Sequence, residues 1–179
     1  MTELKPIRTK NLDNQYGTAT LEWEGVEAVI AAFRAGPGRS WFLGTVRPDG
    51  RPHAAGIGHV WHQGAIFLVT HPEAQKTRNL LADPRCTVSA GLPDWDFVFE
   101  GAAVRETDPA VLAAVTAEFR EGGWPAEADG DVVSAPYSAP SAGAGPWHLY
   151  RMTVHTVVAT AMHEPHGVTK WWFVPADLA

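Results

Sequence analysis

Most hydrophobic positions along this chain fall into short runs bounded by turn residues, a pattern typical of β-strands. Seven runs are rich in β-branched and aromatic residues: SWFLGTV (40–46), HAAGIGHVW (53–61), AIFLVT (65–70), CTVSAGL (86–92), WDFVFEGAAV (95–104), LYRMTVHTVVATAM (149–162) and TKWWFV (169–174). The third run is so continuously apolar that we expect its strand to be buried on both faces. Turn residues at 49–50, 63–64 and 93–94 predict hairpins between neighbouring runs.

Three segments follow the helical period instead. Residues 26–33 place four apolar side chains on one face before Gly36 and Pro37 end the helix. Asp108 has the features of an N-cap, Pro109 suits the first helical position, and apolar residues recur at helical spacing as far as Phe119. A third, shorter helix is predicted to begin at Pro72 and to run toward residue 85.

Hairpin-linked strands with inserted helices predict an α+β fold that is mainly β, an antiparallel barrel or sandwich. No G-x-G-x-x-G or G-x-x-x-x-G-K-[ST] motif is present, which argues against a doubly wound nucleotide-binding sheet. The 179 residues are expected to form one domain, 1–179, without internal repeats. Residues 121–146 are rich in Gly, Pro, Ser and Ala and predict a long loop. Trp124 and Tyr137 within it suggest a lid or an ordered surface connection.

Composition and charge exclude several classes of partner. The formal net charge of −6 disfavours binding to a nucleic-acid backbone, which requires a basic surface. No apolar run is long enough for a membrane-spanning helix, and the first residues lack the apolar stretch of a secretory signal. A single cysteine, Cys86, cannot form an internal disulfide. These features lead us to expect a cytoplasmic protein.

The most informative polar segment is the start of the short helix after Pro72. Lys76 and Arg78 lie in its first turns, where the partial positive charge of free backbone N–H groups disfavours cations. A bound anion such as a phosphate would reverse that effect, because cation, dipole and anion would then attract one another. The sequence therefore predicts an anion site at this helix start, and a solvated surface is the alternative.

These segments together resemble a known family. WFLGTVRPDGRPH, IFLVT, KTRNLLADPR and FVFEGAA, in this order, resemble the split β-barrel proteins of the pyridoxamine 5'-phosphate oxidase-like superfamily, which bind flavin or deazaflavin. The resemblance implies an antiparallel split β-barrel with flanking helices, the FMN-binding split barrel. It also implies a homodimer with the cofactor at the interface.

The same resemblance implies a set of cofactor-binding residues. A K-x-R-N run follows the third strand and holds the cofactor's phosphate in this family, and here it comprises Lys76, Thr77, Arg78 and Asn79. The ring is expected to rest on strand residues that include His53, Gly56, Ile57, Gly58, Val69 and Thr70. Trp171, in an ending similar to that of deazaflavin-type members, is a further candidate for lining the site, with simple packing as the alternative.

The identity of the cofactor stays open between coenzyme F-420 and FMN, with haem as a third candidate through His163 or His166. TVRPDGRP with KTRNLLADPR looks most like the deazaflavin- and flavin-dependent oxidoreductases, whereas the C-terminal signature of true pyridoxamine phosphate oxidases is missing. The implied activity is hydride transfer between the cofactor and a small organic substrate, and a non-catalytic flavin or haem carrier is the alternative.

No catalytic residue is assigned from the sequence. His53 is the first candidate for an acid or base, and a hydrogen-bonded structural histidine is the alternative. We expect no metal site. His59 and His62 would point to opposite faces of a strand, and no H-E-x-x-H motif occurs.

Overall fold

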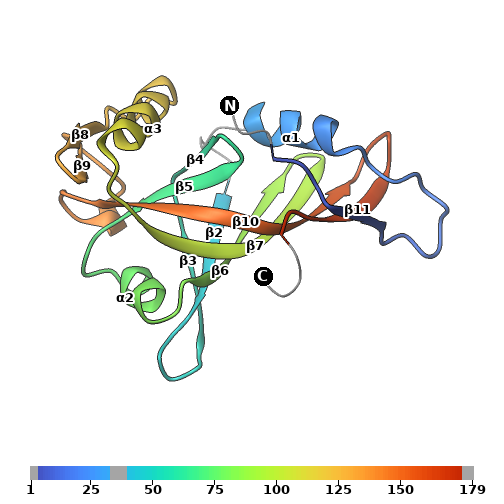
Figure 1. The fold of residues 1–179 in the computed structure, drawn as a ribbon, viewed down its shortest axis with the longest axis horizontal. Helices are drawn as coiled ribbons and strands as arrows, with labels where there is room; N and C mark the ends of the chain where they lie inside the picture. The colour runs from blue at the N-terminus through green and yellow to red at the C-terminus, as the bar shows by residue number, and fades with distance from the viewer. Residues whose placement is uncertain (1–3, 33–39, 175–179) are drawn as a thin grey trace.

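An antiparallel sheet of nine strands organises the molecule, which was studied as a computed structural model describing residues 4–32 and 40–174 (Figure 1). The neighbouring strands follow the order β1-β11-β10-β7-β6-β2-β3, and β5 joins β10 to β4. The strands are β1 (Arg8–Asn11), β2 (Ser40–Val46), β3 (Pro52–Gly56), β4 (His59–His62), β5 (Ala65–Thr70), β6 (Arg85–Leu92), β7 (Trp95–Glu106), β10 (His148–Ala161) and β11 (Gly167–Trp172). The helices are α1 (Trp23–Ala32), α2 (Gln75–Ala82) and α3 (Pro109–Glu121).

The long strand β10 is where the sheet divides. Its first half pairs with β5, from His148 to Thr153, and its second half pairs with β11, from Thr156 to Ala161. Strand β7 runs along its other edge, with a register shift between Val154 and Thr156. A β-bulge of this kind bends a strand and allows its partner to change. The sheet does not close, so the fold is mainly β and has the split-barrel form expected from the sequence.

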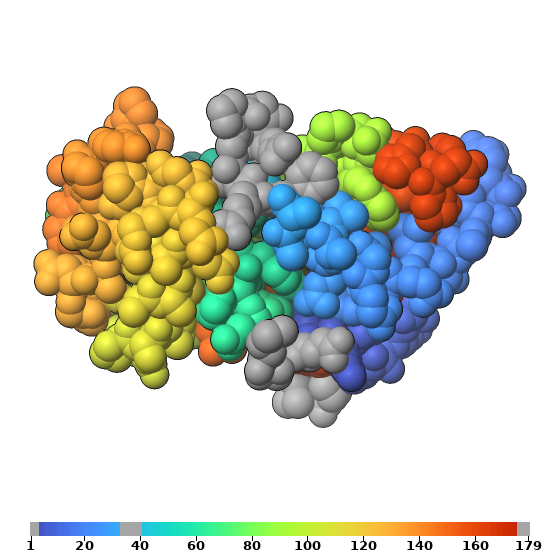
Figure 2. Space-filling model, turned by 90° about the horizontal axis from the view of Figure 1, so that it is seen from above, coloured from blue at the N-terminus to red at the C-terminus, as the bar shows by residue number. Residues whose placement is uncertain are grey.

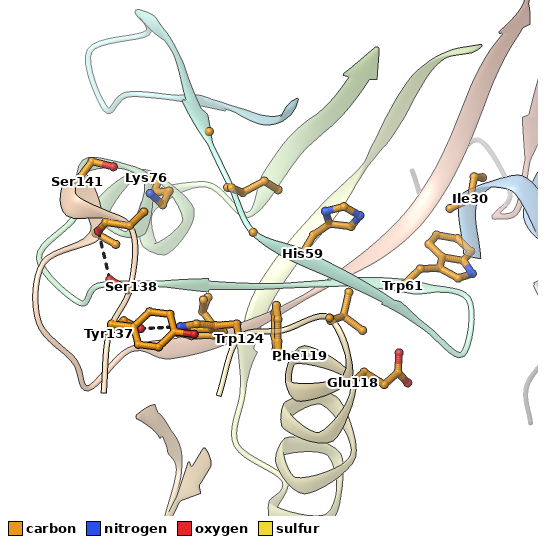
Figure 3. A pocket seen from close by; sticks show the side chains of 18 of the residues that line it. Ile30, His59, Trp61, Lys76, Glu118, Phe119, Trp124, Tyr137, Ser138 and Ser141 are labelled. Atoms are coloured by element: carbon orange, nitrogen blue, oxygen red, sulfur yellow. Dashed lines mark hydrogen bonds between the residues drawn. The ribbon is translucent and has the colours of Figure 1, made fainter. Parts of the chain in front are cut away.

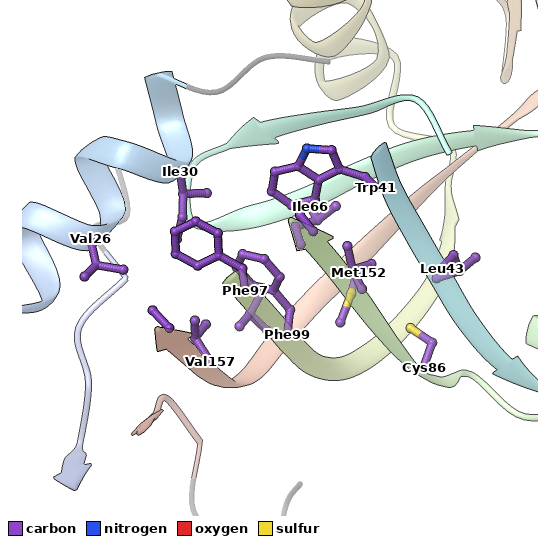
Figure 4. Packing of buried hydrophobic residues seen from close by; sticks show 14 of the residues in the cluster. Val26, Ile30, Trp41, Leu43, Ile66, Cys86, Phe97, Phe99, Met152 and Val157 are labelled. Carbon is purple, nitrogen blue, oxygen red and sulfur yellow. The ribbon is translucent and has the colours of Figure 1, made fainter. Parts of the chain in front are cut away.

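Two hydrophobic clusters fill the molecule. The larger lies inside the sheet and under α1, and its fully buried members include Ile30, Leu43 and Phe99 (Figure 4). The smaller packs α3 against the other side of the β4–β5 hairpin, and its members include Phe67 and Leu112. Strand β5 therefore contributes to both clusters, which explains its continuous run of apolar residues.

Most of the predicted elements are confirmed. Turns with positive φ at Gly50 and at Gln63 and Gly64 connect the predicted hairpins. The side chain of Asp108 caps α3 by accepting hydrogen bonds from the N–H groups of Ala110 and Val111. The helix predicted over 26–33 is α1, which starts earlier, at Trp23, and Phe33 lies outside the described residues.

The structure corrects three details of the sequence prediction. Helix α2 begins at Gln75 and not at Pro72, because residues 72–74 form a turn in which Ala74 N–H donates to the His71 carbonyl. The run 53–61 is broken into β3 and β4, which pair with different strands. The loop 121–146 contains a hairpin of β8 (Glu127–Asp129) and β9 (Val132–Ser134) and a 3-10 turn at Pro140–Ala142.

Two further findings concern an edge strand that was not predicted from the sequence and the lengths of the helices. Strand β1 consists of polar residues at the edge of the sheet, paired with β11, and its RTKN sequence has no apolar alternation to reveal it. Within residues 4–32 and 40–174, no helix is long and apolar enough to span a membrane.

Candidate cofactor site

A cavity of about 520 Å³ lies between the β3–β4 segment, α3 and the segment 137–142. Seen from above, the β4–β5 hairpin surfaces between α3, in yellow, and α1, in blue (Figure 2). In close-up, Lys76 and Ser141 mark one end of the cavity and Ile30 and Trp61 the other, with His59 between them (Figure 3). The cavity is therefore elongated, with a cationic end and an apolar end.

The backbone between β3 and β4 forms an open part of the cavity wall. Gly56, Ile57 and Gly58 all line the cavity, and no atom lies within 4 Å of the position that a Cβ would take at either glycine. Both glycines have ordinary φ values, so a turn does not require them. An open glycine backbone in a strand allows the close approach of a ligand. A flat ring could lie directly against this segment.

Lys76 supplies the cationic end of the cavity. It lies in the first turn of α2, as expected. The N-cap residue of this helix is Ala74, whose side chain cannot accept a hydrogen bond from the free backbone N–H groups. Partial burial lowers the pKa of the lysine. No hydrogen bond or ion pair of its ammonium group occurs within the described part of the chain. A lysine that is partly desolvated without a counter-charge is well placed to bind an anion.

Two further cationic or titratable groups lie near Lys76. The pKa of His53 is lowered by burial first, and then by the charges of Arg47 and Lys76. His53 Nδ1 lies 3.4 Å from Thr45 Oγ1. The side chain of His53 does not line the cavity, so the structure places it beside the cationic end and gives it no contact with the apolar part. The positive potential here favours a negatively charged ligand.

The remaining residues of the K-x-R-N run have structural partners. Thr77 donates to the His71 carbonyl at 2.7 Å and lies 3.0 Å from Thr70 Oγ1, and both threonines are buried. Asn79 is also buried and donates to Thr45 Oγ1 at 2.9 Å. The side chains of Thr70, Thr77 and Asn79 thus hold α2 against β2 and β5. They fix the position of the helix turn that carries Lys76.

Arg78 does not enter the cavity either. Its guanidinium donates to the Glu73 carbonyl at 2.5 Å and to Gln75 Oε1 at 2.9 Å, both near the start of its own helix. The side chain is exposed and would have to leave these partners to reach a phosphate at Lys76. Of the expected binding residues, Gly56, Ile57, Gly58, Val69 and Lys76 line the cavity together.

Trp171 lies elsewhere. It is 1% exposed in the larger hydrophobic cluster, with its ring 5.5 Å from that of Trp23. The packing alternative therefore describes this residue in the single chain, where Trp171 does not line the cavity. The haem candidates His163 and His166 are both exposed in the turn between β10 and β11, away from the cavity wall.

The two central histidines have separate roles. His62 pairs through Nδ1 with Glu118 of α3 and so joins the β4–β5 hairpin to that helix. His59 lines the cavity. Among residues 4–32 and 40–174, no group of three or more His, Cys, Asp or Glu side chains is arranged to hold a metal ion.

Several cavity residues were not foreseen from the sequence. Trp61, Glu118 and Phe119 belong to a strand and a helix that pack together only in three dimensions. Trp124 and Tyr137 were singled out as aromatic residues in a long loop, and both line the cavity. Trp124 donates from Nε1 to the Tyr137 carbonyl at 2.7 Å, so the loop is held in an ordered form.

The comparisons with known proteins agree with this architecture. A sequence model described as pyridoxamine 5'-phosphate oxidase matches residues 27–161, about three quarters of the chain. The chain belongs to the pyridoxamine 5'-phosphate oxidase-like family. The members of this family are flavin-binding split barrels, and the cavity described above lies within the matched region. A comparison with curated proteins gave no match.

Several solved structures are similar to the chain over most of its length. A conserved hypothetical protein from Mycobacterium tuberculosis has a TM-score of 0.61 at 21% identity, covering 84% of this chain and 91% of that one. A pyridoxamine 5'-phosphate oxidase-related, FMN-binding protein from Nostoc punctiforme has 0.57 at 17%, covering 91% and 96%. General stress protein 26 from Bacillus anthracis has 0.55 at 15%, covering 78% and 94%. At these identities the similarity shows the shared fold.

Proposed function

We propose that the cavity binds coenzyme F-420 or FMN and that the protein is an oxidoreductase, transferring a hydride between this cofactor and a small organic substrate. The observation that carries the proposal is the ammonium group of Lys76, partly buried at the uncapped start of α2 and without a counter-charge in the described part of the chain. A phosphate is the group that best complements a lysine and free N–H groups in one place.

The other cavity residues fit the same ligand. The open backbone at Gly56 and Gly58 leaves room for a flat ring system, and Trp61, Phe119 and Trp124 provide apolar walls around it. When bound, the cofactor supplies the hydride chemistry, and the protein binds it, orients it and excludes water. The residues of this chain therefore need to hold a ring and a phosphate, and they offer one end of the cavity for each.

Coenzyme F-420 is the first candidate of the two. The residues TVRPDGRP and KTRNLLADPR resemble those of deazaflavin- and flavin-dependent oxidoreductases. Pyridoxamine phosphate is not the proposed substrate, because these segments resemble the deazaflavin- and flavin-dependent oxidoreductases. A small conjugated or aromatic substrate suits the aromatic walls at the end of the cavity away from Lys76.

A fluorescence titration of the purified protein with FMN and separately with coenzyme F-420 tests the proposal. We expect micromolar or tighter binding of one cofactor, followed by turnover of that cofactor with a panel of enones. Binding without turnover would leave a cofactor carrier as the function. If neither cofactor binds, the proposed function is wrong.

The Lys76→Ala variant should bind the cofactor more than tenfold less tightly, because it loses a charge-assisted contact with phosphate. Lys10→Ala is the matched control, since it removes the same charge from the exposed strand β1. The measurement is the dissociation constant of each variant in the same fluorescence titration. An unchanged affinity of Lys76→Ala would remove this residue from the site.

We also propose that two copies of the chain associate through the outer face of the sheet, defined by Phe42 and Val46 of β2 and Val98 and Val104 of β7. All four apolar side chains are more than 40% exposed. Phe42 and Val98 lie in register with Ser89 of β6 between them, so the apolar surface crosses neighbouring strands. Exposed apolar patches of this kind favour association.

The cavity adjoins this outer face. Gly56 pairs directly with Phe42, and directly paired residues share one face of a sheet. Gly56 also lines the cavity. A second copy seated on the outer face would therefore lie close to the ring-binding backbone, which supports a homodimer with the cofactor near its interface.

A further inference from the structure

His59 occupies a central position in the cavity wall, and the proposed function gives it no role. It is the first residue of β4 and follows directly on Gly58, the end of the open backbone segment. Only 4% of the residue is exposed, although it lines the cavity. In Figure 3 it lies between Lys76 at one end and Trp61 at the other. A ligand that reaches from Lys76 to Trp61 would lie along the part of the wall to which this residue belongs.

Trp41 fixes the orientation of the His59 ring. The two ring centroids are 3.8 Å apart and the ring planes are inclined by 33°. Trp41 is itself 2% exposed and belongs to the larger hydrophobic cluster. An imidazole packed against a buried indole cannot turn freely, so its two nitrogens are held in place before any ligand arrives. Such preorganisation reduces the entropy lost on binding.

The surroundings of His59 keep it uncharged. Burial lowers its pKa from the ordinary value of 6.5 to about 4, and no neighbouring charge contributes to the shift. The imidazole is therefore neutral at physiological pH, with one nitrogen as a hydrogen-bond donor and the other as an acceptor. A neutral imidazole can donate to a ligand without bringing a buried charge into the cavity.

The two nitrogens differ in their access. Nδ1 is sealed from solvent and has no hydrogen-bond partner, while Nε2 is not among the sealed atoms. Nε2 likewise has no hydrogen bond within the described ranges of the chain. A buried N–H group without a partner is rarer than an unpaired acceptor, which favours the tautomer with the proton on Nε2. The accessible nitrogen is then a donor.

We propose that His59 donates a hydrogen bond from Nε2 to a carbonyl oxygen of the planar conjugated ligand in the cavity. The ligand class rests on the proposed function, in which that ligand is either the cofactor or the substrate that exchanges a hydride with it. A carbonyl is the fitting acceptor because Ile57 and Trp61, which line the cavity on the side of the larger hydrophobic cluster, are uncharged. A carboxylate there would lose its hydration without gaining a counter-charge.

The test compares His59→Phe with the wild-type protein. Phenylalanine keeps an aromatic ring against Trp41 and removes the donor, and His166→Phe makes the same change at an exposed position away from the cavity. The probes are FMN, coenzyme F-420 and menadione, a planar conjugated diketone. Binding is followed by the quenching of tryptophan fluorescence, since Trp61 and Trp124 line the cavity.

We expect His59→Phe to weaken the binding of a probe by roughly three- to tenfold, the effect of one lost hydrogen bond, while His166→Phe leaves all affinities unchanged. Weaker binding of FMN or F-420 assigns the carbonyl to the cofactor. Weaker binding of menadione alone, added to cofactor-saturated protein, assigns it to the substrate. If His59→Phe changes no affinity by more than about twofold, the proposal is overturned.

The outcomes separate this inference from the proposed function. If the wild-type protein binds neither FMN nor F-420, the proposed function is wrong and the menadione titration still tests His59. If it binds none of the three probes, the inference fails as well. Should His59→Phe not fold, nitrogen-15 NMR of wild-type His59 decides: we expect an Nε2–H signal that shifts when a probe binds. An Nδ1–H tautomer, or a signal unmoved by a bound probe, would overturn the proposal.

Discussion

Two glycines with opposite surroundings, Gly58 and Gly101, allow the effect of a substitution on ligand binding to be distinguished from its effect on stability. A Cβ at Gly58 would meet no atom within 4 Å, whereas a Cβ at Gly101 would lie 2.0 Å from the Thr153 carbonyl oxygen. We therefore expect Gly58→Val to fill the cavity and weaken cofactor binding, with little change in the melting temperature. Gly101→Ala should instead lower the free energy of unfolding by about 1–3 kcal/mol, because β7 and β10 would have to separate.

Thermal melting and cofactor titration of both variants check this contrast. Gly25→Ala, on the exposed face of α1 with open space around it, is the control for adding a side chain at a glycine. If Gly58→Val binds the cofactor as well as the control does, the β3–β4 backbone is not the surface on which the ring lies.

His59 also predicts a dependence of stability on pH. Its pKa in the folded protein, about 4, lies below the ordinary value of 6.5, so the folded state favours the neutral form. The contribution of the neutral His59 to the free energy of unfolding is fully present above pH 6.5. It is lost as the pH falls toward 4, because the unfolded state then binds a proton that the folded state does not. Between these values, wild-type protein should lose on the order of 2 kcal/mol more unfolding free energy than His59→Phe.

Urea denaturation at a series of pH values measures this difference. Equal losses in the two proteins would show that His59 is not buried in its neutral form. The comparison with His59→Phe matters because other acidic groups also titrate in this range, and among them Glu100 has a pKa lowered chiefly by the hydroxyl of Thr156.

Single residues differ in how far the sequence reveals them. The place of Lys76 in the first turn of a helix could be predicted because a cation there breaks a local rule, although the helix begins at Gln75 and not at Pro72. The place of His59 in the cavity wall could not be predicted, since its environment depends on Trp41, which reaches it from another strand. Trp171 shows the converse, because a tryptophan in a strand gives no sign of whether it packs inward or lines a site.

At the scale of elements, α3 is the helix that closes the cavity opposite the β4–β5 hairpin, and its start depends on one side chain. Asp108 accepts hydrogen bonds from the N–H groups of Ala110 at 2.7 Å and Val111 at 3.3 Å. Asp108→Ala should lower the free energy of unfolding by about 1 kcal/mol, since these donors lose their acceptor.

Chemical denaturation monitored by circular dichroism measures this change. Asp108→Ser retains an oxygen in the same place and serves as the control, with an expected loss of a few tenths of a kcal/mol at most. Equal stability of the alanine and serine variants would mean that the cap contributes nothing to the folded state.

Elements that carry their own signals were predicted well. Hairpins with glycine turns and α3 with its N-cap are specified by neighbouring residues. The break between β3 and β4 is different, because it arises when β3 pairs with β2 and β4 pairs with β5. Strand β1 is held by β11 at a sheet edge, and its polar residues give no local indication of that pairing. Such tertiary effects are absent from a pattern of residues along the chain.

For the whole molecule, the outer face of the sheet predicts association. Phe42 is 46% exposed on this face, and Phe42→Glu would place a charge in the proposed contact. We expect the wild-type protein to sediment as a dimer and Phe42→Glu to shift toward the monomer. Burying an unpaired carboxylate is costly, so the variant should favour separate chains.

Sedimentation velocity at several protein concentrations measures the distribution of species. Tyr16→Glu is the control, because Tyr16 is 80% exposed in the segment after β1 and lies off the outer face. A wild-type monomer, or a Phe42→Glu variant that remains a dimer, would contradict the proposed association.

The two hydrophobic clusters contribute different parts of the cavity wall, and this bears on how the protein can evolve. The cavity lies along their boundary, with Ile30 and Trp61 contributed from the side of the larger cluster and Phe119 and Trp124 from the side of the smaller one. Mutations on the α3 side can therefore reshape the ligand space while the sheet and the Lys76 end stay intact. A scaffold built in this manner can acquire new substrates through mutations on the α3 side alone. Laboratory selection for altered specificity would best begin with residues 119–142.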